Sequence, residues 1–379
     1  MSDLERQEKI LQEVKEFADL EIRPRASEFD KNGVLPREVI DKMAERGYLA
    51  ASLPVEYGGL NLDQVYYGHF NEEIGKACNN TRGLVTVHTS LVGETLVRWG
   101  TQEQKDYWLP RMAKGETITA FGLTEPNIGT NARGVETSYK KEGNTFILNG
   151  RKKWISFGDI ADMFLVVAAN GNEVTTFLVE RSFPGVKTWP IQGLLGGRAS
   201  HIAEIEFKDV AVPAENVLGK EGSGFTYVVS TALDNGRYSI AWAGVALAQA
   251  AVEAMVSYSR KRSQFGQKLY NFQLIQGIIG DSVTKAHAAR SLCVKAGELR
   301  RDNDPNSVIE TTIAKYFTSK VAMEVAIDCV QVHGGNGCYN EYPAERYFRE
   351  AKILEIIEGT SQVQQEMISR YGLRAYYRP

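Results

Sequence analysis

The first third of the chain alternates apolar and polar residues at helical spacing. In residues 4–18 the apolar side chains recur at helical spacing, and Ser2 with Glu5 fits a capping box at the start of this segment. Thr101 with Gln104 fits a second capping box, ahead of the segment QEQKDYWLPRMAKG. These patterns predict a helical amino-terminal domain.

Between about residue 117 and residue 225 the pattern changes to short segments in which apolar and polar residues alternate. Such alternation is typical of strands with one buried face. Turn dipeptides separate the segments, notably Asn149-Gly150 between TFIL and RKKWIS, and Asn170-Gly171 between FLVVAA and EVTTFLVE. We therefore predict a β domain with turns at both dipeptides.

Long helical patterns return after Gly224. The segment SIAWAGVALAQAAVEAMVSYSRKRS carries small residues at close spacing, which indicates tightly packed neighbouring helices. The sequence contains no internal repeat and no low-complexity segment. The predicted fold class is α+β in three domains: a helical domain at residues 1–116, a β domain at 117–225 and a helical bundle at 226–379.

Composition and charge narrow the function without identifying it. The 379 residues are 43% hydrophobic, enough for a sizeable core, and 44 basic against 47 acidic side chains give a formal charge of -3. This balance offers no basic field for nucleic acid or for an anionic membrane. The start MSDLERQEKI lacks the apolar core of a signal peptide, and no run of about 18 apolar residues follows, so we expect a cytoplasmic protein without membrane association.

Residues that commonly carry metal, nucleophilic or nucleotide chemistry are not arranged for it. The four cysteines show no close paired spacing, which favours free thiols in a reducing compartment. The five histidines form no metal-binding spacing, so we expect no metal site. The chain has no G-x-S-x-G elbow, no P-loop and no G-x-G-x-x-G fingerprint. These absences argue against a hydrolase, an ATPase and a Rossmann dehydrogenase.

Five short clusters of Gly, Ser, Thr and aromatic residues remain, which we expect to lie at the seams between the folded domains, where cofactors commonly bind. They are FGLTEPNIGTN (121–131), RKKWISFG (151–158), RSQFG (262–266), QVHGGNG (331–337) and EIIEGTSQ (355–362). Each has an ordinary interpretation when taken alone: a strand entering a turn, core packing by Trp154 and Ser156 on one side of a strand, a surface helix end, a turn between helices, and a solvated carboxylate at Glu358. No single cluster establishes a site.

Together, and in this order, the five clusters resemble the acyl-CoA dehydrogenase family, flavoenzymes that desaturate acyl thioesters beside the carbonyl. The resemblance covers nearly the whole chain. It implies an amino-terminal helical domain, a middle β-barrel or sandwich domain and a carboxy-terminal four-helix bundle, in a homo-oligomer (a tetramer or a dimer) that binds flavin adenine dinucleotide (FAD) at subunit seams. It also implies an acyl thioester substrate, on coenzyme A or on an acyl carrier protein, and an electron acceptor such as an electron-transferring flavoprotein.

The resemblance implies in addition which residues bind FAD. In the family pattern Thr124 and Ser156 hydrogen-bond the flavin ring and Trp154 packs against it, while the residues around Arg262 and Gln331 hold the adenine and pyrophosphate end, largely from a neighbouring subunit. The implied cofactor-binding residues are Phe121, Leu123, Thr124, Gly129, Thr130, Trp154, Ser156, Arg262, Gln264, Phe265, Leu269, Gln331, Gly334, Gly335, Thr360 and Gln362.

Glu358 takes the place of the family's catalytic base, which removes the proton beside the thioester carbonyl. Ile356 and Ile357 would keep its surroundings dry and raise its pKa, and Gly359 would let the backbone approach the substrate. The resemblance places Arg237 at the substrate entrance. A structural ion pair is an alternative role for that arginine.

The chain departs from the common family pattern at several positions. Residues 129–131 read GTN in place of Gly-Ser-Asp, Gly236 stands where some members carry an alternative base, and Phe272 stands where others have a histidine near the adenine. Trp242 together with AKILEIIEGTSQ resembles a branch that acts on carrier-protein thioesters in polyketide pathways, such as those making hydroxymalonyl or aminomalonyl extender units. The substrate expected from that branch is a small polar acyl group on a phosphopantetheine arm.

Three other interpretations stay open from the sequence. An oxidase or monooxygenase on the same scaffold would let oxygen reach the reduced flavin. A non-catalytic, flavin-bearing homologue would use its surface to bind nucleic acid, which the net charge of -3 argues against. A purely helical scaffold protein would leave the five clusters unexplained.

Overall fold

The amino-terminal part of the chain is helical, as predicted. The computed structural model describes residues 2–378, and the α-helices of this part are α1 (Asp3–Phe17), α2 (Ala26–Asn32), α3 (Arg37–Glu45), α4 (Gln64–Ala77), α5 (Asn79–Val85), α6 (Glu94–Trp99) and α7 (Gln102–Ala113). Both predicted capping boxes are formed, by Ser2 with Glu5 at α1 and by Thr101 with Gln104 at α7. A π-helical segment, η5 (Thr86–Gly93), continues α5 toward α6.

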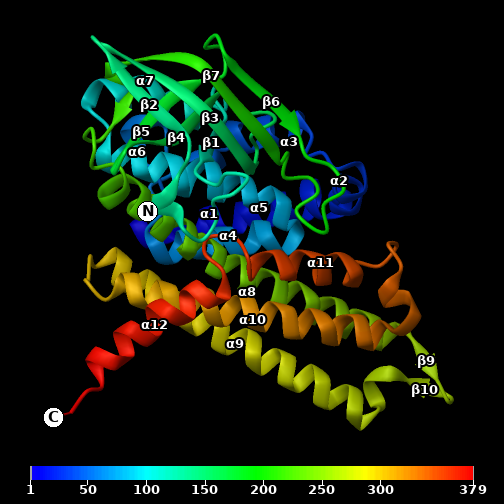
Figure 1. Ribbon diagram of the computed structural model, residues 1–379. Coiled ribbons are helices and arrows are strands. Elements are labelled where there is room, and N and C mark those ends of the chain that lie inside the picture. Colours follow the sequence, from blue (N-terminus) through cyan, green and yellow to red (C-terminus); the bar gives the residue numbers. More distant parts are fainter. Residues whose placement is uncertain (1, 379) are drawn as a thin grey trace.

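The middle part of the chain forms a mixed sheet, drawn in the upper part of Figure 1. Its strands are β1 (Thr119–Gly122), β2 (Ser138–Glu142), β3 (Thr145–Ile155), β4 (Met163–Asn170), β5 (Glu173–Glu180), β6 (Val186–Pro190), β7 (Ala203–Pro213) and β8 (Val217–Leu218). Their spatial order is β6-β7-β3-β2-β4-β5-β8, and β1 pairs in parallel with β4 outside this path. The predicted β domain is therefore confirmed.

The turn predicted at Asn149-Gly150 is wrong. β3 runs through both residues, and its pairing with β7 shifts register at this point. Asn149 Nδ2 lies 3.0 Å from Asp209 Oδ1 across the irregularity, and a Cβ on Gly150 would lie 2.6 Å from Thr137. The dipeptide marks a β-bulge and a close backbone approach, because the residues that suit a tight turn suit these features too.

Glycines form both hairpin turns, but only the second turn lies close to its predicted position. β2 and β3 are joined through Gly143, with a φ of 63°, and Asn144. β4 and β5 are joined through Gly171, with a φ of 59°, and Asn172, one residue later than predicted. In both loops the glycine takes the left-handed conformation that a two-residue hairpin loop requires.

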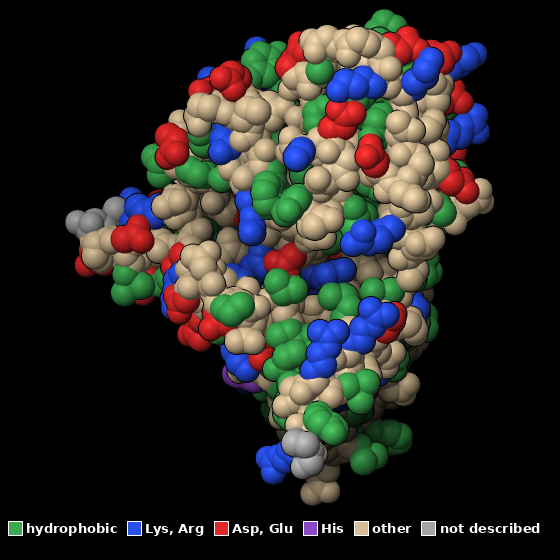
Figure 2. Space-filling view, turned by 60° about the vertical axis from the view of Figure 1, so that its left-hand side comes forward, with side chains coloured by type: hydrophobic (Ala, Val, Ile, Leu, Met, Phe, Trp, Pro, Cys, Tyr) green, Lys and Arg blue, Asp and Glu red, His purple; other side chains and the backbone are tan. Residues whose placement is uncertain are grey.

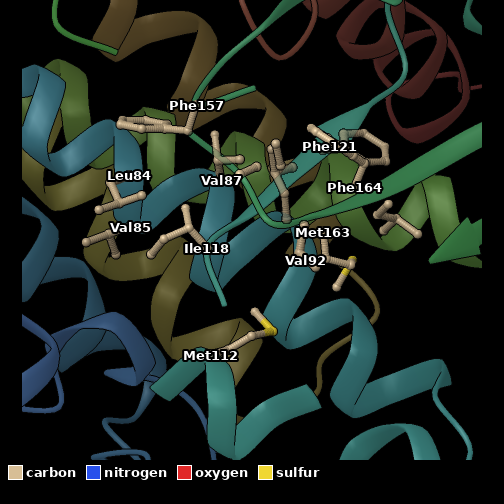
Figure 3. Packing of buried hydrophobic residues seen from close by; sticks show 14 of the residues in the cluster. Leu84, Val85, Val87, Val92, Met112, Ile118, Phe121, Phe157, Met163 and Phe164 are labelled. Atoms are coloured by element: carbon tan, nitrogen blue, oxygen red, sulfur yellow. The ribbon is translucent and has the colours of Figure 1, made fainter. Parts of the chain in front are cut away.

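The sheet and the amino-terminal helices share one hydrophobic core. Figure 3 shows Leu84 and Val87, from α5 and η5, among Ile118, Phe121 and Phe164 of the sheet region. All of these side chains except Val87 and Phe121 are fully buried, and those two retain only 7% and 9% exposure. The helices that carry one wall of the site are thus fixed directly against the strands that carry the other.

The carboxy-terminal part is a bundle with its own apolar core. Its α-helices are α8 (Ser230–Lys261), α9 (Gln273–Arg301), α10 (Ser307–His333), α11 (Ala344–Leu354) and α12 (Ser361–Ala375). α8 and α10 approach closely at Gly244, where a Cβ would lie 2.7 Å from Thr318, as the small-residue pattern predicted. The segment Phe225–Lys261 is long and apolar enough to cross a membrane, but 78% of its most apolar window is buried, as in the central helix of a bundle.

Candidate active site

A cavity of about 680 Å³ lies where the sheet, the amino-terminal helices and the bundle meet. In Figure 2, Lys and Arg side chains gather along the seam between the upper and lower parts of the molecule, with an acidic side chain among them. Many of the residues predicted to bind cofactor or substrate line this cavity: Phe121, Leu123, Thr124, Gly129, Thr130, Trp154, Ser156, Arg237, Glu358, Gly359 and Thr360. These residues come from the middle and carboxy-terminal parts of the chain, and Arg82 and Leu91 add lining from the amino-terminal part.

Trp154 and Ser156 line the cavity, but they do not do so as alternate residues of a regular strand. The pairing of β3 with β7 shifts between Lys152 and Ile155, and Trp154 has a φ of 62°. β3 ends at Ile155, so Ser156 lies in the turn that follows. The predicted placement on one side of a regular strand is wrong, although both residues line the cavity. Half of the Trp154 surface (50%) stays exposed, which leaves an aromatic ring in a strained bulge free to pack against a ligand.

The β side of the cavity offers hydroxyl groups without partners. Thr124, Thr130 and Ser156 line the cavity, and their side chains make no hydrogen bond within the described part of the chain. Together with the Trp154 ring they provide donors, acceptors and an aromatic face, which are the groups that bind and tune a flavin ring. The residues present therefore fit FAD.

A buried ion pair supports this wall from behind. Lys152 and Glu125 are both almost inaccessible, and Lys152 Nζ lies 2.6 Å from Glu125 Oε1 and 3.2 Å from the Leu123 carbonyl oxygen. The Glu125 carboxylate also accepts hydrogen bonds from the backbone N–H groups of Glu136 and Thr137. Every charge in this group has partners, so the segment 123–137 is tied to β3 next to the cavity.

Glu358 occupies a strained loop between α11 and α12. Its φ is 53° and that of Gly359 is 92°, and a non-glycine residue in this region costs roughly 1–3 kcal/mol. Side chains hold the two carbonyl oxygens of the loop: Glu358 O accepts from Arg237 Nε at 3.3 Å and from Gln364 Nε2 at 3.1 Å, and Gly359 O accepts from Lys315 Nζ at 2.7 Å. The surrounding helices therefore impose the conformation.

The Glu358 carboxylate lines the cavity without a partner. Its Oε2 atom is buried and makes no hydrogen bond. Burial raises the pKa of Glu358 to about 7, although the positive charges of Arg237, Lys315 and Arg82 oppose the shift. A Cβ on Gly236 would lie 2.5 Å from Oε2, so this glycine makes room for the carboxylate as well as lacking an alternative base.

The two isoleucines before Glu358 contribute less to its burial than predicted. Ile356 and Ile357 line the cavity but keep 52% and 36% of their surface exposed in the single chain. The buried surroundings of the carboxylate come instead from η5 and α8, where Leu91 is 3% exposed and Gly236 is buried. A hydrophobic pair next to a charge in the sequence does not establish which atoms cover that charge.

Arg82 and Lys315 are site residues that sequence analysis missed. Arg82, on α5, lines the cavity and is 2% exposed, and Lys315, on α10, is fully buried behind the Glu358 loop. Burial lowers the pKa of Lys315 to about 8. Each is a single charge inside a helical segment, and the only available signal was a basic residue at a position otherwise suited to the core.

A second group of predicted cofactor residues lies outside the cavity. It consists of Arg262, Gln264, Phe265, Leu269, Gln331, Gly334, Gly335 and Gln362. Arg262 ends α8 just before the hairpin of β9 (Ser263–Gln264) and β10 (Gln267–Lys268), at the right-hand end of the bundle in Figure 1, and Phe265 at its tip is 92% exposed. Gln362 is an exception to this placement, because it lies at the start of α12 between the cavity-lining residues Thr360 and Val363. The roles of all eight residues stay a prediction.

The structure offers little for metal or thiol chemistry. Among the described residues, no group of three or more His, Cys, Asp or Glu side chains could hold a metal ion. Cys78, Cys293 and Cys329 are buried free thiols, and Cys338 is an exposed one.

Comparison with known proteins identifies relatives along the whole chain. Sequence models of the acyl-CoA dehydrogenase family match its N-terminal domain at residues 4–116, its middle domain at 120–210 and its C-terminal domain at 222–373. The chain is 38% identical to the short-chain specific acyl-CoA dehydrogenase of Clostridium acetobutylicum over 368 residues, which cover 96% of this chain and 97% of that protein.

Solved structures agree with this match. A chain reported for the electron transferring flavoprotein of Acidaminococcus fermentans superposes with a TM-score of 0.95 at 39% identity, covering 99% of both chains. Glutaryl-CoA dehydrogenase of Mycobacterium smegmatis, solved with FADH2, gives 0.92 at 28% identity over 100% and 97% of the two chains. A prolyl acyl carrier protein oxidase gives 0.92 at 26% over 98% and 99%. These matches confirm the predicted fold class, cofactor and enzyme class: the chain belongs to the acyl-CoA dehydrogenase family of FAD-dependent oxidoreductases that act on CH–CH groups.

Proposed function

We propose that this protein desaturates a small acyl thioester, with Glu358 as the base that removes the α-proton. When bound in the cavity, FAD supplies the acceptor for the hydride that leaves the neighbouring carbon. One observation carries the proposal: the Glu358 carboxylate lines the cavity with a buried, unpartnered Oε2, and burial raises the pKa of Glu358 to about 7. Such a carboxylate is partly ionised at neutral pH and is more basic than an exposed one.

The loop that carries Glu358 also provides for the charge that develops on the substrate. Removing the α-proton places negative charge on the thioester oxygen, which must be stabilised by a donor already in position. The backbone N–H of Glu358 donates no hydrogen bond within the described part of the chain, so it is free to bind that oxygen. Arg237 and Lys315 hold the loop carbonyls and favour negative charge in the same region.

We propose that the acyl group is small and polar and is carried on a phosphopantetheine arm, either of coenzyme A or of an acyl carrier protein. A cavity of about 680 Å³ that must also hold a flavin ring leaves little space for a long acyl chain. The similarity to a short-chain specific acyl-CoA dehydrogenase and to a prolyl acyl carrier protein oxidase supports a small acyl group and leaves either carrier possible. The similarity to a chain reported for an electron transferring flavoprotein supports that class of electron acceptor.

We also propose that the protein acts as a homo-oligomer in the cytoplasm. The predicted adenine-end residues lie at the exposed end of the bundle, and Phe265 presents a large apolar side chain there. An exposed aromatic group of this kind is typical of a contact surface. In the assembly, the hairpin would complete the cofactor site of a neighbouring subunit.

The test is anaerobic bleaching of the flavin absorbance by a panel of small acyl thioesters, each on coenzyme A and on a carrier protein. The wild-type protein is expected to bleach with one class of thioester. Glu358→Gln keeps the size of the side chain but not its basicity, so we expect bleaching to slow by about 10²–10⁴-fold. Glu355→Gln, whose side chain pairs with Lys352 instead, is the matched control and is expected to bleach normally. Equal rates for wild type and Glu358→Gln would remove Glu358 as the base, and oxygen consumption during turnover would favour an oxidase.

A further inference from the structure

Arg82 is a buried arginine that lacks a carboxylate partner. Its Nε donates to Asn79 Oδ1 at 2.9 Å, and its Nη1 donates to the Thr86 hydroxyl and lies 3.5 Å from the Ser239 hydroxyl. Its Nη2 makes no hydrogen bond to the described residues. It is also not among the fully buried polar atoms that lack a partner, so it keeps some exposure. Since Arg82 is only 2% exposed and lines the cavity, Nη2 faces the cavity. Burial accordingly lowers the pKa of Arg82 to about 10.

Three other arginines of this protein with little exposure pair directly with carboxylates, whereas Arg346, which is 6% exposed, donates to the Ser27 hydroxyl. The nitrogen atoms of the three paired arginines lie 2.5–2.6 Å from carboxylate oxygens: Arg290 with Glu72, Arg300 with Asp234, and Arg349 with Asp30. In these three the pKa of the arginine is raised, whereas that of Arg82 is lowered. The buried Glu350 influences Arg82 but accepts its hydrogen bond from Asn80 instead. A buried guanidinium whose hydrogen-bond partners are all neutral side chains, as in Arg82, is costly until an anion joins it.

The position of Arg82 relative to the base follows from α8. Gly236 and Ser239 are three residues apart on this helix, so they lie on one face about one turn, roughly 5 Å, apart. The Glu358 carboxylate lies over Gly236, and the Arg82 guanidinium lies beside Ser239. Arg82 is thus about one helical turn beyond the base, on the helical wall of the cavity.

The charges that line the cavity leave an excess of positive charge at this wall. They are Arg82, Glu125, Arg237 and Glu358. Glu125 is neutralised by Lys152, so two guanidinium groups remain beside one carboxylate. An apolar acyl group would leave Arg82 buried and unpaired.

We propose that Arg82 binds a carboxylate at the far end of the acyl group, which makes the substrate the thioester of a short dicarboxylic acid. This inference rests on the proposed function, because it takes Glu358 to mark the α-carbon. A chain of a few carbons covers the distance of one helical turn from the base to the guanidinium. A guanidinium–carboxylate contact inside a cavity is charge-assisted and can be bidentate, so it selects for the carboxylate over a methyl group of similar size.

The test compares two ligands that differ only at the end of the chain. S-butyl-coenzyme A and S-(3-carboxypropyl)-coenzyme A are thioethers that cannot react, so calorimetric titration of the FAD-loaded protein measures binding without turnover. We expect wild type to bind the carboxylated ligand about 10- to 100-fold more tightly, the ratio that one charge-assisted contact provides. Equal or tighter binding of S-butyl-coenzyme A would overturn the inference, and this outcome needs no variant.

Variants test whether Arg82 is the residue that causes the preference for the carboxylated ligand. Arg82→Met removes the charge but keeps an unbranched side chain, and it is expected to abolish the preference for the carboxylated ligand. Arg82→Lys is expected to restore part of it. Arg98→Met, at an exposed arginine on α6, is the matched control and is expected to keep the wild-type ratio. A preference that survives in Arg82→Met would also overturn the inference.

The inference and the proposed function can fail separately. Bleaching by butyryl-coenzyme A that depends on Glu358, with no preference for the carboxylated ligand, would remove the role of Arg82 and leave the reaction intact. Preferential binding of the carboxylated ligand without bleaching by any thioester would keep the anion site and remove the dehydrogenase assignment.

Discussion

Buried charge is arranged in opposite ways on the two sides of the cavity. On the β side, Lys152 and Glu125 are almost inaccessible, and each finds partners within the chain. On the helical side, Glu358 has a buried oxygen without a partner, and Arg82 has a nitrogen without one. A paired buried charge holds the fold in place, whereas an unpaired one is stabilised only when a ligand arrives.

This difference separates structural from functional charges more sharply than burial does. Lys152 and Lys315 are both fully buried lysines. Lys152 meets a carboxylate at 2.6 Å, while Lys315 meets only the Gly359 carbonyl oxygen and acts on Glu358 through its charge. The comparison predicts that removing charges on the β side costs stability, and that removing them on the helical side changes catalysis.

The largest expected effect is on stability, at Lys152. Lys152→Met leaves Glu125 buried and without its counter-charge, which is expected to lower the free energy of unfolding by about 3–5 kcal/mol. Chemical denaturation of the FAD-loaded protein measures it. Lys152→Met/Glu125→Gln removes both charges while keeping an acceptor for the Thr137 N–H, so it is expected to recover part of the loss. Arg82→Met is expected to cost less than Lys152→Met, and equal losses for the two would contradict the comparison.

The second-largest expected effect is on the rate of flavin reduction, in the variant Gly236→Ala. In Gly236→Ala the added methyl group would lie 2.5 Å from Glu358 Oε2 and 2.7 Å from Leu91 Cδ2, so the carboxylate must move. A displacement of about 1 Å at a reacting group costs about 10²-fold in rate. Rapid-mixing measurement of flavin reduction at saturating thioester is the appropriate assay. Gly277→Ala, on α9 with no atom within 4 Å of the new Cβ, is the control and should reduce flavin at the wild-type rate.

A smaller effect is expected in the pH dependence, at Lys315. The reaction needs Glu358 ionised, so activity rises with pH through its pKa of about 7. The positive charge of Lys315 lowers the pKa of Glu358, and Lys315→Met therefore raises that pKa and moves the acid limb of kcat/KM to higher pH, by up to about one unit. Lys320→Met, at an exposed position on the same helix, should leave the limb in place. An acid limb that does not move, or that moves to lower pH, would show that Lys315 does not act through its charge.

Much of the cavity could be predicted from the sequence because its walls come from contiguous clusters. The clusters around Thr124, Trp154 and Glu358 each carry a backbone conformation and a chemical group together, and each contributes residues that line the cavity. Local sequence records such features because glycines, prolines and hydroxyl residues act on their own neighbours.

Long-range features could not be predicted in the same way. Arg82 and Lys315 are single charges in ordinary helical segments, and Lys152 lies between two other basic residues of a strand. The burial of each depends on elements far away in the sequence, such as α8 for Arg82. The bulge at Asn149-Gly150 was missed for a related reason: only the pairing of β3 with β7 decides whether such a dipeptide turns the chain or distorts a strand.

The smallest expected effect extends the comparison from charged to apolar groups. Phe265 is 92% exposed at the tip of the β9–β10 hairpin, with a φ of 50°, so a strained backbone presents an apolar ring to solvent in the single chain. By the same reasoning as for Arg82, a group left without a partner within one chain points to a partner outside it, here a neighbouring subunit. Phe265→Ser is expected to lower the retained flavin a few-fold and to shift the assembly toward smaller species.

Flavin content after gel filtration and mass by light scattering measure both changes in one experiment. Val55→Ser, at a 65% exposed residue of the amino-terminal part, is the matched control because it removes a similarly exposed apolar side chain away from the hairpin. If Phe265→Ser retained flavin and mass as wild type does, the hairpin would be an ordinary surface feature, and an unpartnered group would indicate function in this protein only where it is a buried charge.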